Sequence, residues 1–300
     1  IESPLQARLV IAGAGSGKTA TMVDRVVWLV ANGFVRADEV LGVTFTRKAA
    51  GELRERMRTR LNILRERKLI DLTEQEGPSE PTVSTYHSYA NTLVKDYGLR
   101  LGIEQDAQML GDAQAWQLVA QIVQYWDGEL PQGGKGEAAS KTYLVKQVLK
   151  LAGECAEHLV APQTVIEFCT AQSAAYESLS TPGPRKAAND TLRQLQTKII
   201  LARMVQRYAR VKARMQVLDY GDLIALAARI ARDVPQAVQL ERERYKVVLL
   251  DEFQDTSHAQ LQLFSDLFGT RAAEGEHPGY GEHPVMAVGD PKQSIYGFRG

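Results

Sequence analysis

Residues 12–19 read Ala-Gly-Ala-Gly-Ser-Gly-Lys-Thr and follow a short apolar run, Leu9-Val10-Ile11-Ala12, that is typical of a buried strand. A glycine-rich turn between a strand and a helix lets several backbone N–H groups converge on one anion, and the helix N-terminus adds a partial positive charge. The pattern therefore predicts a phosphate-binding loop, although an ordinary glycine-rich turn would look similar in isolation. The residues expected to surround the phosphates are Ala12, Gly13, Ala14, Gly15, Ser16, Gly17, Lys18 and Thr19.

The last two residues of this loop have specific chemistry. In loops of this kind the lysine reaches the β- and γ-phosphates of a nucleotide, and the hydroxyl that follows binds Mg²⁺. We expect Lys18 and Thr19 to take these roles, so a nucleoside triphosphate and Mg²⁺ are the predicted ligands of this loop. Ala12 stands where the strict pattern has glycine, which is a departure at one position of the motif.

A second candidate feature is a pair of carboxylates directly after an apolar run at 247–250. In a parallel sheet, ligands bind at the carboxyl edge, where such residues lie. Asp251 is expected to bind Mg²⁺, which prefers oxygen ligands, and Glu252 to act as the general base on the attacking water. A solvated strand end would show the same residues, but together with the phosphate-binding loop the pair predicts a nucleotide hydrolase.

Short apolar runs alternate with helical patterns at both ends of the chain. Strands are expected at 9–12, 39–43, 82–85, 247–250 and 285–288. Apolar strands separated by helices predict a parallel sheet that is covered on both faces. Between about 104 and 230 the pattern is helical apart from two loops, at 128–140 and 178–185, so the sequence predicts an α/β fold with a large helical insertion.

Composition narrows the class of protein without deciding its partner. Lys+Arg and Asp+Glu both number 36, so net charge neither supports nor excludes nucleic acid. Cys155 and Cys169 have neither metal-ligand nor disulfide spacing and are expected to pack in helices, a usage typical of the cytoplasm. No stretch is apolar enough to span a membrane. Because the chain lacks an initiator methionine and both ends look cut, we expect a fragment of a longer protein.

The positive charge is unevenly distributed along the chain. Residues 47–68 hold nine basic and three acidic residues, and residues 185–216 hold nine basic and one acidic residue. Since phosphate contacts provide most of the affinity for DNA, these runs are candidate DNA-binding surfaces, although a solvated helix face would have the same composition. In the second run we expect Arg207, Arg210 and Arg214 to lie on the face that meets DNA.

Further motifs, in a fixed order along the chain, narrow the class. They are Thr44-Phe45-Thr46-Arg47-Lys48-Ala49-Ala50, Thr85-Tyr86-His87-Ser88, Asp219-Tyr220-Gly221-Asp222-Leu223, Asp251-Glu252-Phe253-Gln254-Asp255-Thr256 and Gly289-Asp290-Pro291-Lys292-Gln293-Ser294-Ile295-Tyr296-Gly297-Phe298-Arg299-Gly300. Together with the phosphate-binding loop, these motifs resemble the UvrD/Rep/PcrA-like superfamily 1 DNA helicases. The resemblance covers nearly the whole chain and is weakest over about 104–215.

The resemblance implies a RecA-like P-loop NTPase fold and a motor function. It implies ATP hydrolysis coupled to movement on single-stranded DNA, with 3′ to 5′ polarity, in DNA repair or recombination. The expected domains are a RecA-like core 1A in two parts, 1–103 and 217–300, and a helical insertion similar to domain 1B at 104–216. We expect this chain to hold the first motor core of the family without the second, and without the arginines of that second core we expect weak ATP hydrolysis by this chain alone.

The family motifs also imply roles for particular residues. Gln254 resembles the residue that couples nucleotide to DNA, and Gln293 resembles the catalytic residue that senses the γ-phosphate. Base–aromatic stacking tolerates any base sequence, which a protein that moves along DNA requires, whereas the aromatic residues at 296 and 298 would otherwise be expected in a core. The DNA-binding candidates are Phe45, Thr46, Arg47, His87, Tyr296 and Phe298.

The expected partners follow from the same resemblance. They are single-stranded DNA, junctions of single- and double-stranded DNA, and the second motor core of the parent chain. One alternative is a motor subunit of a helicase–nuclease complex similar to RecBCD or AdnAB, with a second helicase–nuclease subunit as partner. Another is a DNA-binding scaffold subunit that no longer hydrolyses ATP, against which the presence of Lys18, Thr19, Asp251 and Glu252 argues.

Overall fold

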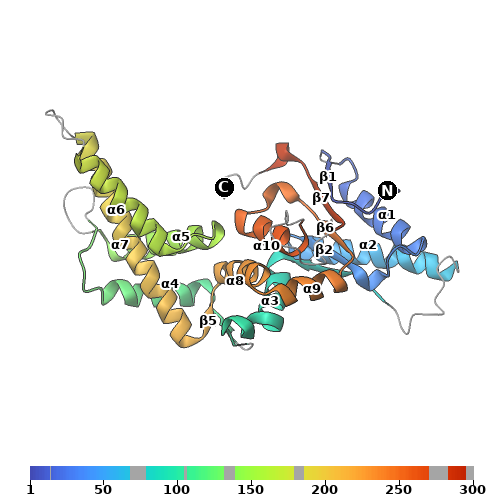
Figure 1. Cartoon of the computed structure of the whole chain (residues 1–300), viewed down its shortest axis with the longest axis horizontal. Coiled ribbons are helices and arrows are strands. Elements are labelled where there is room, and N and C mark those ends of the chain that lie inside the picture. The colour runs from blue at the N-terminus through green and yellow to red at the C-terminus, as the bar shows by residue number, and fades with distance from the viewer. Residues whose placement is uncertain are drawn as a thin grey trace. The chain divides into compact units, whose positions relative to one another are not determined.

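The computed structural model describes residues 1–13, 15–67, 79–104, 107–131, 139–178, 186–269 and 283–294. The chain divides into two compact units, the first formed by Ile1–Gly102 and Leu226–Gly300 and the second by Ile103–Ala225. Figure 1 labels most of their helices and strands. Across the described ranges, none of the helices combines the length and the apolar character that crossing a bilayer requires.

The first unit is built on a five-stranded parallel sheet in the order β1-β7-β6-β2-β3. The strands are β1 (Arg8–Ile11), β7 (Val285–Gly289), β6 (Val247–Leu250), β2 (Val40–Thr44) and β3 (Thr82–Thr85). Every residue of β2 and β6 is buried, which explains their continuous apolar sequences, because both faces of these strands are covered. The predicted α/β fold with a parallel sheet is confirmed.

Helices cover both faces of this sheet (Figure 1). On one face, α1 (Lys18–Ala31) and α2 (Arg47–Glu66) form a core with alternate strand residues. The members include Met22, Val26, Leu29, Leu53, Met57, Val40, Val247, Leu249 and Val288. The unit also contains α3 (Tyr86–Tyr97), α9 (Pro235–Arg244) and α10 (His258–Phe268). The rings of Tyr86 and Tyr89 on α3 contact Phe264 on α10 at centroid distances of 5.4 and 5.6 Å.

Polar residues at the strand ends start the next helices without a long loop. The Thr46 hydroxyl accepts a hydrogen bond from the Ala49 N–H at 3.1 Å and caps α2. Thr85 caps α3 in the same way through Ser88 N–H, also at 3.1 Å. Such caps satisfy helix donors that would otherwise lack partners. As a result the carboxyl ends of β2 and β3 pass directly into helices, which fixes the short loops at this edge of the sheet.

Short 3₁₀ turns complete the first unit. They are η1 (Ala37–Glu39), η2 (Gly98–Leu101), η3 (Phe253–Asp255) and η4 (Pro291–Gln293). Two of them, η3 and η4, lie just beyond the ends of β6 and β7, which are neighbours in the sheet. The residues after these two strands therefore fold back close to the sheet edge.

The second unit is helical. Its helices are α4 (Asp112–Gln124), α5 (Lys141–Glu157), α6 (Pro162–Ser178) and α7 (Lys186–Met215), and α8 (Tyr220–Asp233) starts here. Helices α4, α5 and α7 share a core that includes Val119, Ile122, Leu144, Val148, Met204 and Tyr208. Cys155 and Cys169 are buried in α5 and α6, as predicted.

Two short strands in the second unit differ from the helical prediction. Strand β4 (Gln108–Met109) pairs in parallel with β5 (Val217–Leu218), so the two ends of the segment lie side by side. Strands of two residues have no detectable periodicity, which is why the sequence did not indicate them. The predicted loop at 178–185 lies outside the described residues from 179 onward, and the loop at 128–140 is described except for 132–138.

Candidate functional site

The glycine-rich loop joins β1 to α1, as the sequence predicted, with the strand ending at Ile11 and the helix starting at Lys18. Gly15 and Gly17 have φ angles of 72° and 86°, in the left-handed region that favours glycine. The Ser16 hydroxyl donates to the carbonyl of Gly13 at 2.6 Å and tightens the turn. The described part of the loop, which excludes Ala14, is exposed or half-buried and therefore accessible to an anion.

Lys18 and the acidic residues after β6 lie together, although 234 positions separate them in the sequence. The Lys18 ammonium donates to Glu252 Oε2 at 3.1 Å; the lysine side chain is 9% exposed and the glutamate side chain 40%. Strand β7 stands between β1 and β6, so this contact crosses the carboxyl edge of the sheet. The structure thus brings two of the predicted catalytic residues into direct contact.

Asp251 lies at the buried end of β6. Its N–H donates to the carbonyl of Val43 on the neighbouring β2, and its Oδ1 accepts from the Glu252 N–H at 3.0 Å. Burial and then the adjacent Glu252 raise the pKa of Asp251, and Lys18 opposes this rise. A carboxyl group in this environment would be stabilised as an anion by a further cation. Thr19, the other predicted metal ligand, is the half-buried second residue of α1.

Glu252 has an unusual backbone conformation, with φ 50° and ψ 42°. A residue other than glycine in the left-handed region costs roughly 1–2 kcal/mol, and such strain concentrates at functional sites. The turn at Glu252 lets two adjacent acidic residues both leave the strand at the sheet edge.

The end of β7 meets the loop after β6 through a set of amide hydrogen bonds. Gln254 Nε2 donates to Glu252 Oε2 at 2.8 Å, while Gln254 Oε1 accepts from the Asp290 N–H at 2.9 Å. Gln293 Nε2 donates to Asp290 Oδ2 at 2.6 Å. A Cβ atom built on Gly13 of the phosphate-binding loop would lie 3.8 Å from Asp290 Oδ2. Gln293 is therefore held beside the same loop as Lys18.

Sequence reasoning left Asp290 and Gly289 out of the candidate site. Asp290 is buried and accepts from both the Lys292 N–H and Gln293, and the Gly289 carbonyl accepts from the Ala12 N–H at 3.1 Å. The signal that could have identified Asp290 is the one used for Asp251, namely an acidic residue directly after a buried strand. No pattern in the sequence indicates that Gly289 contacts the phosphate-binding loop.

The first DNA-binding candidates follow two neighbouring strands. Thr44 of β2 lies opposite Thr85 of β3, so the residues after them are close. The half-buried Phe45 ring lies 4.9 Å from that of Tyr86, between centroids. His87 is half-buried at the start of α3.

The remaining candidates are Thr46, Arg47, Tyr296 and Phe298. Thr46 and Arg47 are exposed at the start of α2, beside Phe45. Tyr296 and Phe298 lie outside the described residues. The described candidates therefore share the carboxyl edge of the sheet with the residues that the sequence predicts for nucleotide binding.

Several basic residues of the first charge run interact with the protein itself. On α2, Arg54 donates to the carbonyl of Val83, and Arg65 donates to that of Ser79 at 2.6 Å. Arg58 pairs with Glu80 at 3.3 Å. These arginines hold α2 to β3 and the residues before it. This part of the charge run therefore supports the fold, while Arg47 remains exposed at the helix start.

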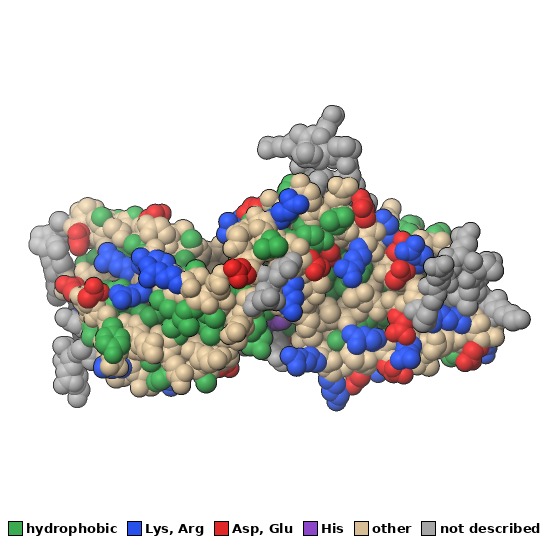
Figure 2. Space-filling view, turned by 90° about the horizontal axis from the view of Figure 1, so that it is seen from below, with side chains coloured by type: hydrophobic (Ala, Val, Ile, Leu, Met, Phe, Trp, Pro, Cys, Tyr) green, Lys and Arg blue, Asp and Glu red, His purple; other side chains and the backbone are tan. Residues whose placement is uncertain are grey.

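The second charge run lies mainly on α7. Arg210 and Arg214 are exposed, and Arg207 is 42% exposed with Asp127 at 3.6 Å. Figure 2 shows Lys and Arg side chains gathered beside hydrophobic side chains on the second unit. Lys212 is different, because it is buried between Asp219 and Asp222 and contributes little to this surface.

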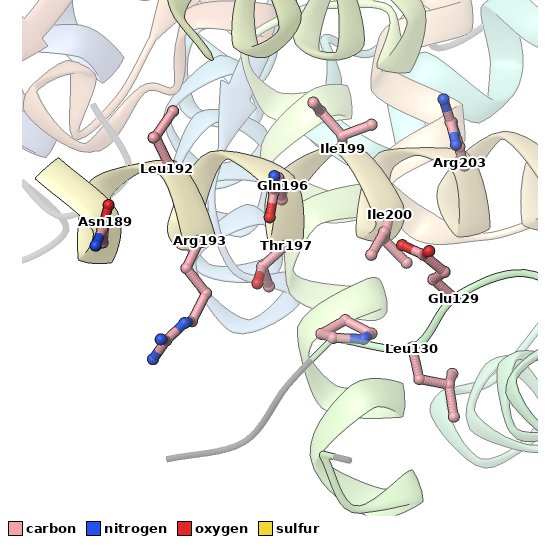
Figure 3. Close-up of a pocket in the computed structure, with 11 residues that line it drawn as sticks. Glu129, Leu130, Asn189, Leu192, Arg193, Gln196, Thr197, Ile199, Ile200 and Arg203 are labelled. Atoms are coloured by element: carbon pink, nitrogen blue, oxygen red, sulfur yellow. The ribbon is translucent and has the colours of Figure 1, made fainter. Parts of the chain in front are cut away.

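A cavity of about 410 Å³ lies along the N-terminal half of α7 (Figure 3). Arg193 and Arg203 come from the helix, whereas Glu129 and Leu130 come from the segment after α4. All of its lining residues belong to the second unit. The cavity therefore shares none of the residues predicted for nucleotide binding.

The parallel sheet, the glycine-rich loop and the acidic pair at one edge define a P-loop α/β protein. A family model described as the UvrD/REP helicase N-terminal domain matches residues 1–300. The chain therefore belongs to the UvrD/REP helicase family, and the resemblance noted in the sequence is confirmed.

Individual relatives agree with this family. The chain is 26% identical to DNA helicase II of Haemophilus influenzae over 300 residues, covering 100% of this chain and 34% of the relative. It is 29% identical to the ATP-dependent DNA helicase UvrD1 of Mycobacterium tuberculosis, covering 99% and 32%, and 31% identical to UvrD2 of the same species, covering 97% and 35%. The chain thus spans about a third of the length of these relatives.

Proposed function

We propose that this chain is an ATP-binding motor core of a DNA helicase or translocase. The proposal rests mainly on one observation, the contact of Lys18 with Glu252 beside the buried Asp251 at the carboxyl edge of a parallel sheet. This arrangement places a phosphate-binding cation next to two carboxylates with distinct roles. Relatives named ATP-dependent DNA helicases support the same activity.

In this proposal, different residues of the site bind the phosphates, activate the water and respond to the γ-phosphate. The backbone of residues 12–17 and the Lys18 ammonium would bind the phosphates, and Glu252 would accept a proton from the attacking water. Because Lys18 donates to Glu252 here, a bound phosphate would compete for the lysine and free the carboxylate. Gln293, held at Asp290, is the candidate that responds to the γ-phosphate.

Mg²⁺ fits the donor set of this site. Asp251 and Thr19 provide oxygen atoms, which this hard cation prefers, and the raised pKa of Asp251, caused by burial and Glu252, indicates a carboxyl group short of positive charge. When bound, the ion would neutralise charge on the phosphates.

DNA would contact the same sheet edge at Phe45, Thr46, Arg47 and His87, with Tyr296 and Phe298 as further candidates. In this proposal the first unit corresponds to core 1A and the helical unit to domain 1B. Movement in the 3′ to 5′ direction, a role in repair or recombination, binding at junctions and pairing with a second motor core belong to the same proposal, and the family resemblance supports them. A cytoplasmic location also belongs to it.

The test is ATP hydrolysis by the intact protein with and without single-stranded DNA. We expect DNA to stimulate hydrolysis, and Lys18→Ala to abolish it, because the variant loses the cation that binds the β- and γ-phosphates. Arg36→Ala, which removes an exposed side chain paired with Asp38, is a control expected to retain activity. Hydrolysis that does not respond to DNA, or that survives Lys18→Ala, would contradict the proposal. DNA binding by an intact protein that does not hydrolyse ATP would favour the scaffold alternative.

A further inference from the structure

Gln254 connects two loops of the site through both ends of its side chain. Its Nε2 donates to Glu252 Oε2 at 2.8 Å, and its Oε1 accepts from the Asp290 N–H at 2.9 Å. Its backbone carbonyl also accepts from the Ser294 hydroxyl at 3.2 Å. The oxygen of Glu252 that Gln254 contacts is the one that Lys18 contacts at 3.1 Å. The orientation of the Glu252 carboxylate is thus set by the lysine and by this amide.

An amide is the group that this position requires. It offers a donor and an acceptor at once, whereas a carboxylate only accepts and an apolar side chain does neither. The donor is needed for the Glu252 carboxylate and the acceptor for the Asp290 N–H. A glutamate in place of Gln254 would keep the second bond, lose the first and place two negative charges side by side. Substitution by glutamate therefore tests the hydrogen bond to Glu252 separately from the hydrogen bond with the Asp290 N–H.

Gly289 makes room for this amide. A Cβ atom built on Gly289 would lie 2.5 Å from Gln254 Oε1 and 3.0 Å from Gln254 N. Contacts under 3.0 Å do not persist, so one of the groups must move. Gly289 lies in β7 with an ordinary strand conformation, and it is not among the residues with positive φ. The absence of a side chain is thus needed at this position for space next to Gln254.

We propose that Gln254 is a positioning residue that links the loop after β7 to the carboxylate of Glu252, and that Gly289 is required to admit its side chain. The inference rests on the proposed ATP hydrolysis and deepens it. Gln254 acts through Glu252 and needs no contact with the nucleotide. Displacement of the Asp290 backbone would move the amide and, through it, the carboxylate that activates water.

The experiment compares DNA-stimulated ATP hydrolysis by the intact protein in four variants. They are Gln254→Ala, Gln254→Glu, Gly289→Ala and the double variant of Gln254→Ala with Gly289→Ala. Misplacing a general base reduces kcat, so we expect losses of roughly 10- to 100-fold for each single variant, with KM for ATP changed less than about threefold. The double variant should be close to Gln254→Ala, because the methyl group added to Gly289 then loses its 2.5 Å conflict with the side-chain oxygen and keeps only the longer contacts, 3.0 and 3.3 Å, with the backbone nitrogens of residues 254 and 253.

Gly153→Ala is the matched control, because a Cβ at that helical position in α5 meets nothing within 4 Å. Thermal unfolding and ADP binding report whether each variant is folded. If Gly289→Ala unfolds the protein and Gln254→Ala restores it, the steric conflict with Gln254 is shown directly. The Gln254→Glu variant is nearly isosteric and tests the donor separately.

Three results would overturn the inference. They are a wild-type kcat in Gln254→Glu, losses in the two single variants that multiply in the double variant, or a raised KM with unchanged kcat. Lys18→Ala separates this inference from the proposed function. If Lys18→Ala abolishes hydrolysis while the Gln254 variants retain it, only the positioning role fails; if Lys18→Ala has no effect, the proposed function itself fails.

Discussion

At the scale of single residues, two buried carboxylates of the first unit have different surroundings. Asp251 lies beside Lys18 at the sheet edge, where a further cation would stabilise it. Glu241 on α9 is 2% exposed and accepts hydrogen bonds from the hydroxyls of Tyr89 at 2.6 Å and Tyr97 at 3.0 Å. Burial raises the pKa of Glu241, and its two hydrogen bonds only partly oppose this rise. Glu241 is therefore a structural group whose protonation affects stability.

We expect Glu241→Gln to change how stability depends on pH. A carboxyl whose pKa is raised on folding favours the fold at low pH, and this contribution is lost as the pH rises from the unfolded value of about 4.3 through the higher folded value. The unfolding free energy of the wild type, relative to that of the variant, should therefore fall across this window and then level off. Urea denaturation at a series of pH values measures it.

The exposed Glu243 on the same helix provides the matched control, as Glu243→Gln. Its pH profile should run parallel to that of the wild type. If the profile of Glu241→Gln is also parallel to that of the wild type, protonation of Glu241 is not coupled to folding, and the prediction is wrong.

At the scale of elements, a charged cluster joins the end of α7 to the start of α8. Lys212 donates to Asp219 and Asp222 at 2.6 Å each, and the Tyr208 hydroxyl donates to Asp219 at 2.9 Å. The two aspartates also cap each other's N–H groups, at 2.9 and 3.0 Å. Gln216, between the helices, has a φ of 53°. The cluster thus fixes the sharp turn that contains β5.

Lys212→Met should destabilise the protein by roughly 2–4 kcal/mol, because it leaves two adjacent carboxylates without their cation. The expected loss is not larger because the side chains of Asp219 and Asp222 are 23% and 26% exposed, so water partly screens their charges. Adding Asp222→Asn should recover part of the loss by removing one of the like charges. Chemical denaturation measures both effects. Arg210→Met, an exposed change on the same helix, should stay within about 0.5 kcal/mol, and an equal effect of the two changes would contradict the prediction.

Much of the first unit could be predicted from the sequence because its elements are long, apolar or capped. Strand β3 has the predicted bounds, since Thr85 both ends the strand and caps the helix that follows it. The proximity of Lys18 to Glu252 follows from the edge of a parallel sheet. The contacts of Gln254 with Asp290 could not be predicted, because they depend on side-chain geometry between two loops. Lys212 was counted as surface charge for the same reason.

At the scale of the whole molecule, the net charge of zero conceals an uneven distribution. Part of the positive charge interacts with the protein itself, in the contacts of the α2 arginines with β3 and the residues before it and in the ion pairs of Lys212 with Asp219 and Asp222. Arg207, Arg210 and Arg214 remain on α7 with exposed or partly exposed side chains. They are therefore candidates for binding phosphates, together with other exposed basic residues of α7 such as Arg203.

Reversing Arg207, Arg210 and Arg214 to Glu should weaken DNA binding and flatten its salt dependence. Each phosphate contact contributes about 0.7 to 0.9 to the slope of log affinity against log salt, so losing three contacts should reduce the slope by about 2. Fluorescence anisotropy over a salt series measures this slope. Lys150→Glu, on α5 and paired with Glu154, is the control. An unchanged slope in the triple variant would exclude this face as a DNA-binding surface.

The strand order β1-β7-β6-β2-β3 has a mechanical consequence. Neighbouring strands are about 4.8 Å apart, so the four steps from β1 to β3 span roughly 19 Å. ATP chemistry would occur at the loops after β1, β7 and β6, and the described DNA-binding candidates Phe45 and His87 follow β2 and β3, toward the other end of this span. Because each strand is hydrogen-bonded to its neighbours, the sheet holds these loops in fixed order. A movement of the phosphate-binding loop would reach the loops after β2 and β3 through the loops after β7 and β6. The distance between any two of these loops is therefore set by the number of strands that separate them in the sheet.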